Sequence, residues 1–260
     1  LDATEPNAMF RELIRALSKE EQVVILLDEY DKPILNNIGK AHAPAILEYL
    51  KSFYSVIKAF EGYLRFAFVT GVSKFSHVSI FSDLNNLSDI TMNADYASML
   101  GYTQAELESC FAERIADGAK KVNKPVAELL EQIKSWYDGY RFEESSESVY
   151  NPVSVAQFFL NNCKFNNYWF STGTPSFLIE LIKKTRFDFE KALSKPVSGL
   201  AFDAFEIDRI EPLALLLQTG YLTIKDSFKE FNSTFYHLDF PNFEVRSSFD
   251  TYLLNAYTDI

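Results

Sequence analysis

Five consecutive apolar residues, Val23–Leu27, lead directly into two carboxylates, Asp28 and Glu29. The run is too short for a typical helix, and its β-branched start favours a strand. An unbroken apolar run is typical of a strand that is buried on both faces, as in a parallel sheet. In open sheets of this kind, ligands bind at the carboxyl ends of the strands. The sequence therefore predicts a buried strand that presents Asp28 and Glu29 at a ligand-binding edge.

A helix and a second strand follow at the spacing of a βαβ unit. Apolar residues recur on one helical face over 45–60, Gly62 breaks that helix, and 64–71 has the pattern of a strand. Such units place their two strands parallel, with a right-handed crossover between them. An amphipathic helix over 6–16 precedes the first strand, and 88–92 is a candidate third strand. We therefore expect an α/β fold built on a parallel sheet.

The middle of the chain has the pattern of successive helices. Thr103 and Glu106 form a capping box, which predicts a helix to about residue 118. Pro125 opens a further helix, and Gly139 suits a left-handed cap after it. Two more helix starts pair a polar cap with proline, at 151–152 and 174–175.

The last residues predict a helix, a hairpin and a helix. The first helix covers 210–219, the strands cover 221–225 and 234–240 around a polar loop, and Asn242 caps the final helix. This order is compatible with a winged-helix module. We expect three domains: a partial core over 1–95, a helical domain over 96–205 and the winged-helix-like module over 206–260.

Composition narrows the classes of partner. The formal net charge is −11, and an acidic surface disfavours strong non-specific binding to nucleic acid. No apolar run approaches the roughly 18 residues of a membrane span, and the amino terminus lacks a signal-peptide pattern. The two cysteines, Cys110 and Cys163, match no metal or redox spacing, which fits a reduced, cytoplasmic protein. We expect no membrane partner.

The strand-end carboxylates resemble the Walker B element of nucleotide hydrolases. In that role Asp28 would hold the Mg²⁺ of a bound nucleotide, and Glu29 would orient or deprotonate the attacking water. Thr70 ends the second strand, where a polar residue can touch the γ-phosphate as a sensor, and Lys74 follows closely as a nucleotide-binding candidate. The alternatives are a carboxylate pair that caps the next helix and a plain turn with a surface lysine.

Arg141 and the aromatic run 168–170 can each be interpreted in two ways. Arg141 is a candidate arginine finger, which would stabilise transition-state charge. It could instead end a helix and stack on Tyr140 or Phe142. The aromatic run 168–170 is a candidate platform for stacking bases, although core packing is favoured.

Eight ordered strings are spread over most of the chain. They are LLDEYDKPI (26–34), FVTGVSKFS (68–76), SIFSDLNNL (79–87), YDGYRF (137–142), YNP (150–152), YWFSTGTP (168–175), QTGYLTI (218–224) and PNFEVR (241–246). These strings closely resemble the predicted AAA-ATPase-like family of bacterial proteins. The resemblance implies a P-loop ATPase core that uses ATP and Mg²⁺, a helical lid and a winged-helix-like end. It also implies a PD-(D/E)XK nuclease-like domain after this point, which members of the family typically carry.

The chain departs from the family pattern in two ways. The phosphate-binding loop GxxxxGK[ST] is absent, and no Asp or Glu is followed two residues later by the Lys that the nuclease site needs. We therefore expect a fragment, truncated at both ends, that hydrolyses little or no ATP by itself while its full-length parent is an ATPase. The alternative is a non-catalytic module whose carboxyl-terminal part binds a partner protein or DNA.

Overall fold

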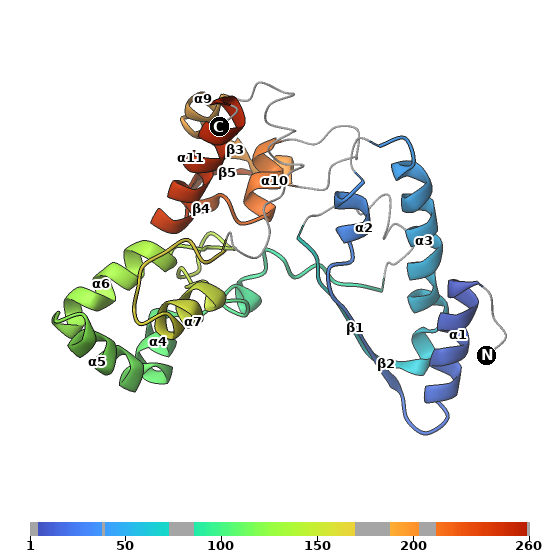
Figure 1. Ribbon diagram of the computed structural model, residues 1–260. Coiled ribbons are helices and arrows are strands. Elements are labelled where there is room, and N and C mark those ends of the chain that lie inside the picture. The colour runs from blue at the N-terminus through green and yellow to red at the C-terminus, as the bar shows by residue number, and fades with distance from the viewer. Residues whose placement is uncertain (1–4, 38–39, 73–85, 170–187, 203–211, 259–260) are drawn as a thin grey trace. The chain divides into compact units, whose positions relative to one another are not determined.

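The computed structural model describes residues 5–37, 40–72, 86–169, 188–202 and 212–258 (Figure 1). These residues form two compact units, and each is described by itself below. The first comprises Leu1–Ser88 with Leu200–Glu211, and the second comprises Asp89–Gly199 with Pro212–Ile260. A short 3₁₀ helix, η4 (Gly199–Phe202), lies at the boundary between them in the sequence. The three domain boundaries expected from the sequence stay a prediction.

The first unit contains a parallel pair of strands. Strand β1 (Val23–Leu27) pairs with β2 (Leu64–Val69), and the register aligns Leu27 with Val69. The connection between them runs through a long helix, α3 (Ala43–Ala59), as a βαβ crossover requires. The α/β class and the two parallel strands predicted from the sequence are confirmed.

Aromatic contacts hold the helices of this unit together. Helix α1 (Pro6–Leu17) lies beside α3 in Figure 1, and the rings of Phe10 and Phe53 stack between them with centroids 4.9 Å apart. The guanidinium of Arg15 on α1 lies 5.2 Å from the ring centroid of Phe60, which follows α3. The described part of the unit also contains the short helices α2 (Lys32–Leu35) and η1 (Glu61–Tyr63).

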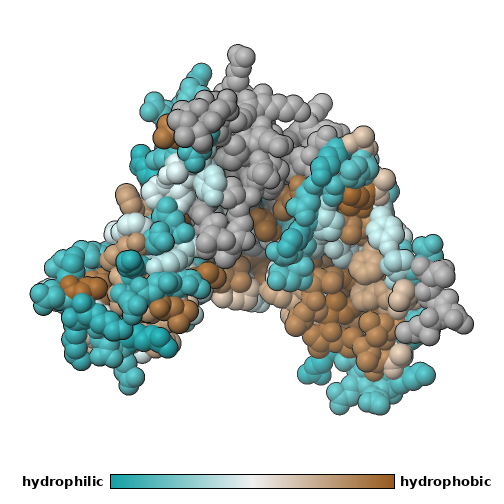
Figure 2. Space-filling model, viewed as in Figure 1, coloured by the Kyte–Doolittle hydropathy of each residue, from teal (hydrophilic) through white to brown (hydrophobic). Residues whose placement is uncertain are grey.

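Only one face of strand β1 is buried within the described residues, so the expectation of burial on both faces is wrong there. Ile25 is buried, whereas its neighbours Val24 and Leu26 are 49% and 70% exposed. Phe66, the register partner of Val24, is 53% exposed, and Figure 2 shows apolar side chains gathered over these strands. Side chains alternate across a strand, and among the described elements α1 and α3 lie on one side of the pair (Figure 1).

The candidate third strand is absent. The described residues from 87 to 92 form a turn and irregular chain, and a 3₁₀ helix, η2 (Ala94–Tyr96), follows them. Asn93 caps this turn by accepting a hydrogen bond from the backbone of Asp95 at 2.9 Å. Short polar side chains that bond to nearby backbone compete with the ladder of a sheet, which explains the wrong prediction.

Helix starts in the second unit follow their capping residues. The capping box of Thr103 and Glu106 is formed, but the single helix expected to residue 118 is two helices separated at Phe111. Asn151 accepts hydrogen bonds from two backbone amides at the next predicted start, and the start expected at 174–175 lies outside the described residues. The helices are α4 (Gln104–Cys110), α5 (Ala112–Lys121), α6 (Val126–Tyr137), α7 (Pro152–Leu160) and α9 (Phe189–Leu193).

An aromatic-rich core joins helices α4 to α7. Tyr137 and Phe158 are fully buried with ring centroids 5.8 Å apart, and Tyr168 is buried in the same cluster. Tyr168 therefore packs in the core, which the sequence analysis favoured over a role in stacking bases. Gly139 has the positive φ of 107° predicted for a cap residue, and its backbone lies directly against the carbonyl of Pro241.

A three-stranded antiparallel sheet and two helices complete the second unit. The long polar loop predicted between the hairpin strands is wrong. The first strand extends to Glu230, which leaves a two-residue turn at Phe231 and Asn232. Both residues have positive φ, which matches the right-handed twist of a tight hairpin. The strands run in the order β3 (Val197–Ser198), β5 (Ser233–Asp239), β4 (Thr223–Glu230), with helices α10 (Pro212–Gln218) and α11 (Phe243–Thr258).

A buried carboxylate connects distant parts of this unit. Glu244 at the start of α11 is fully buried and accepts hydrogen bonds from the hydroxyl of Ser154 at 2.7 Å and the backbone amides of Tyr168 and Trp169 at 2.6 and 2.9 Å. Asn242 caps α11 as predicted, with its side chain accepting from the backbone of Val245 at 3.0 Å. Across the described residues, none of the helices has the length and apolar character needed to cross a bilayer.

Candidate functional site

The carboxyl ends of β1 and β2 meet at one edge of the first unit. The register aligns Leu27 with Val69, so Asp28 and Thr70 leave the two strands side by side. Two backbone hydrogen bonds continue the pairing past the strands. The amide of Thr70 donates to Leu27 at 2.8 Å, and the amide of Tyr30 donates to Thr70 at 3.0 Å. The parallel pairing thus brings together two residues that the sequence singled out separately.

The side chains of Asp28 and Thr70 are in direct contact. The hydroxyl of Thr70 donates to Oδ1 of Asp28 at 2.5 Å, and the backbone amide of Glu29 donates to the same oxygen at 2.9 Å. Within the described residues, Oδ2 of Asp28 has no hydrogen-bond partner. Asp28 is exposed and Thr70 is half-buried at the strand ends, so a ligand can reach the carboxylate of Asp28.

Glu29 adopts a backbone conformation that few residues other than glycine and asparagine use. Its φ is 54°, in the left-handed region, which costs an L-residue on the order of 1 kcal/mol. Its carboxylate accepts a hydrogen bond from the ammonium of Lys32 at 2.5 Å, and both side chains are at least half exposed. This hydrogen bond, with the charge of Glu29, raises the pKa of Lys32 above its ordinary value. Lys32 is the first residue of α2 and was not among the sequence candidates.

Asp31 is fully buried beside the exposed carboxylates. Its two oxygens accept from the backbone amide of Val72 at 3.2 and 3.0 Å, which joins the loop after β1 to the loop after β2. Tyr54 of α3 donates to the carbonyl of Tyr30 at 3.1 Å, and burial raises the pKa of Tyr54. The sequence offered one signal for Asp31, an aspartate directly before the Lys-Pro start of a helix.

Gly71 lies in close contact with this buried carboxylate. A Cβ atom at Gly71 would contact the ring of Tyr30, with Cδ1 at 2.5 Å, and would lie 2.7 Å from Oδ1 of Asp31. No side chain fits there without movement. The glycine therefore lets the loop after β2 approach close enough for Asp31 to reach Val72.

Two sequence candidates remain, Arg141 and Lys74. Arg141 belongs to the second unit, where its backbone amide donates to the hydroxyl of Thr223 at 2.7 Å. Its guanidinium donates to the carbonyl of Lys225 at 3.2 Å. Lys74 lies outside the described residues. Among the residues that the structure describes, no three His, Cys, Asp or Glu side chains form a group able to hold a metal ion.

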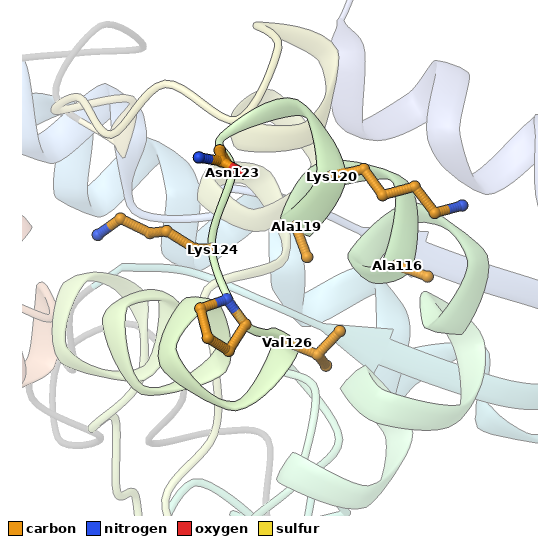
Figure 3. A pocket seen from close by; sticks show the side chains of 7 residues that line it. Ala116, Ala119, Lys120, Asn123, Lys124 and Val126 are labelled. Carbon is orange, nitrogen blue, oxygen red and sulfur yellow. The ribbon is translucent and has the colours of Figure 1, made fainter.

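A hollow of about 420 Å³ lies between helices α5 and α6 of the second unit (Figure 3). Lys120 and Lys124 line it, and their ammonium groups point away from each other in the figure. Lys120 pairs with Asp117 at 3.2 Å and Lys124 pairs with Glu128 at 2.8 Å. The hollow contains none of the sequence candidates, and its two cations already have partners, so we assign it no ligand.

Comparisons with known proteins identify one family and one curated relative. Residues 1–81 match the model of the AAA-ATPase-like family, described as predicted AAA-ATPase. An uncharacterized protein in the vnfD 5′ region of Azotobacter chroococcum mcd 1 is 40% identical over 257 residues, which cover 97% of this chain and 47% of that protein. The chain thus spans about half the length of this relative. No solved structure matches the chain.

Proposed function

Because residues 1–81 match the predicted AAA-ATPase family, we propose that they form part of a site that hydrolyses ATP with Mg²⁺. The observation that carries this proposal is the 2.5 Å hydrogen bond between Thr70 and Asp28 at the carboxyl edge of a parallel strand pair. Ligands of open α/β sheets bind at this edge. We assign this proposed ATP hydrolysis to a polypeptide that carries these residues together with a phosphate-binding loop.

The residues at the edge suit a magnesium ion that a nucleotide helps to bind. Mg²⁺ is commonly held by one or two protein oxygens, with waters and phosphates completing the shell. Asp28 would supply such an oxygen through Oδ2, which has no partner within the described residues. The ion would neutralise charge on the phosphates.

The proposed roles of the other residues follow from their positions. Glu29 would accept the proton of the attacking water or orient it. Thr70 would sense the γ-phosphate, because its hydroxyl lies at the same edge as Asp28. Lys74 and Arg141 are proposed to contact the nucleotide and to stabilise transition-state charge, respectively.

The proposal also includes a more detailed assignment of the fold. The parallel strand pair with its crossover helix supports a P-loop-type core, the helices α4 to α7 support a lid, and α10, the β4–β5 hairpin and α11 support a winged-helix-like end. Cys110 and Cys163 are both free thiols, which supports a reducing, cytoplasmic location. The 260 residues contain no GxxxxGK[ST], so by themselves they turn over little or no ATP.

The test compares two glutamate variants in the longest polypeptide that the gene encodes. Glu29→Gln keeps the shape of the side chain but removes its basicity, and we expect ATP turnover to fall at least about a hundredfold. Glu61→Gln changes an exposed glutamate of η1 in the same unit and serves as the matched control. Equal turnover in the two variants would remove Glu29 from the mechanism.

A second candidate function is partner binding by the second unit. Phe231 at the turn of the β4–β5 hairpin is 94% exposed, Phe228 on β4 is 39% exposed, and the ring of Phe228 stacks on that of Phe235 with centroids 5.4 Å apart. Exposed apolar side chains grouped on one element suit contact with a protein or with DNA. Pull-down of a partner by the wild-type chain but not by Phe231→Ser would support this function independently of ATP turnover.

A further inference from the structure

The proposed base is already engaged in an ion pair. Glu29 accepts from the ammonium of Lys32 at 2.5 Å, and no hydrogen bond joins its carboxylate to Thr70 or Asp28 in the described residues. Asp28 and Thr70 are instead bonded to each other. A carboxylate that acts as a general base must contact the attacking water before it can accept a proton from that water. In this arrangement the partner of Glu29 is a cation on the neighbouring helix.

The backbone around the pair makes one partner fixed and the other movable. Lys32 begins α2, whose next residues include the buried Ile34 and Leu35, and the preceding Asp31 is fully buried. Glu29 has the uncommon φ of 54° on an exposed loop, where relaxation to an ordinary conformation would carry its carboxylate elsewhere. An exposed ion pair is weak enough to open readily. The geometry therefore has the properties of a reversible latch.

We infer that Lys32 is a positioning residue that holds the carboxylate of Glu29 on α2 in the resting protein and so lowers basal ATP turnover. The inference rests on the proposed function.

The kinetic test changes Lys32 in the longest polypeptide that the gene encodes. Lys32→Met retains the aliphatic stem but removes the charge, and we expect kcat to rise about two- to fivefold with KM unchanged, because an exposed pair favours its closed state by about that factor. Lys32→Arg retains the pair and should keep the wild-type kcat. The ratio of the Met variant to wild type should shrink toward one as salt screens the pair.

A spectroscopic test needs no nucleotide. In the 260-residue chain, the ammonium protons of Lys32 should exchange with water more slowly in wild type than in Glu29→Gln, measured in ¹⁵N-correlated NMR spectra. Lys51 pairs with Glu48 at 2.6 Å with the same i,i+3 spacing, so its ammonium signal is the internal control and should not change. Equal exchange of Lys32 in the two proteins would overturn the inference.

The outcomes separate the latch from the function on which it rests. If Glu29→Gln abolishes turnover while Lys32→Met equals or falls below wild type, the ATPase stands and the latch is wrong. If Glu29→Gln retains full turnover, the proposed role of the base is wrong, and the latch falls with it. A raised kcat in Lys32→Met, restored by Lys32→Arg, supports both.

Discussion

The hydroxyl of Thr70 donates a 2.5 Å hydrogen bond to the carboxylate of Asp28, 42 residues earlier in the chain. Each residue directly follows a strand, and the two strands are parallel with aligned ends. The bond therefore ties together the loops that leave the sheet, at the edge where a ligand of an α/β sheet binds. Four predictions about stability, three at this edge of the sheet and one in the second unit, can be measured on the 260-residue chain.

Thr70→Val removes the hydroxyl donor and keeps a β-branched side chain at the end of β2. We expect the free energy of unfolding to fall by about 1 kcal/mol, since an exposed hydrogen bond to a carboxylate contributes modestly. Thr70→Ser retains the donor and should lose less. Urea denaturation of the three proteins measures the difference, and a Val variant as stable as the Ser variant would mean that the bond does not contribute in solution.

Gly71→Ala places a methyl group against Tyr30 and Asp31. A Cβ there lies 2.5 Å from Cδ1 of Tyr30 and 2.7 Å from Oδ1 of Asp31, so the loop or the ring must shift. We expect a loss of about 1–3 kcal/mol, the usual cost of overpacking. Gly62→Ala is the matched control, because a Cβ at Gly62 meets nothing within 4 Å. Equal changes in the melting temperature of the two variants would contradict the close contact.

Asp31→Ala leaves the backbone amide of Val72 without the carboxylate that accepts its hydrogen bond. The free energy of unfolding should fall by about 1.5–3 kcal/mol, the usual contribution of a hydrogen bond to a charged group. Asp31→Asn keeps one acceptor oxygen of similar shape and should lose less than the alanine variant. Chemical denaturation gives both values, and a tolerated alanine would show that another group replaces the carboxylate.

The stability of the second unit should depend on pH through Glu244. Burial raises the pKa of this carboxyl, although hydrogen bonds from Trp169, Ser154 and Tyr168 act in the opposite direction. The folded protein then holds the proton more tightly than the unfolded chain does. Stability should therefore fall as the pH rises from about 4.5, the ordinary pKa, through the raised value.

Glu244→Gln tests this dependence because glutamine does not titrate. Urea midpoints measured across this pH range should decline less steeply in the variant than in wild type. Tyr137, Tyr140 and Tyr168 also lie close enough to interact with Glu244, but their pKa values are raised and they stay protonated throughout. Parallel pH profiles for the two proteins would place the titration elsewhere.

Local chemistry decided the elements that the sequence predicted correctly. The capping box of Thr103 and Glu106 and the caps at Asn151 and Asn242 are formed because their side chains bond to amides only two or three residues away. The strand at Val23–Leu27 follows from its own apolar run. The first hairpin strand was predicted too short, since a Phe-Asn turn with two positive φ values carries no glycine to mark it.

The residues themselves determined that this chain has a parallel βαβ unit with carboxylates at a strand end, because side-chain shape and polarity act within a few positions. Only the tertiary structure decided that Thr70 reaches Asp28, that Asp31 is buried on Val72 and that Lys32 pairs with Glu29. The first two contacts join segments about 40 residues apart, and their formation depends on the strand register. The third depends on a left-handed backbone at Glu29, which no local preference of glutamate favours.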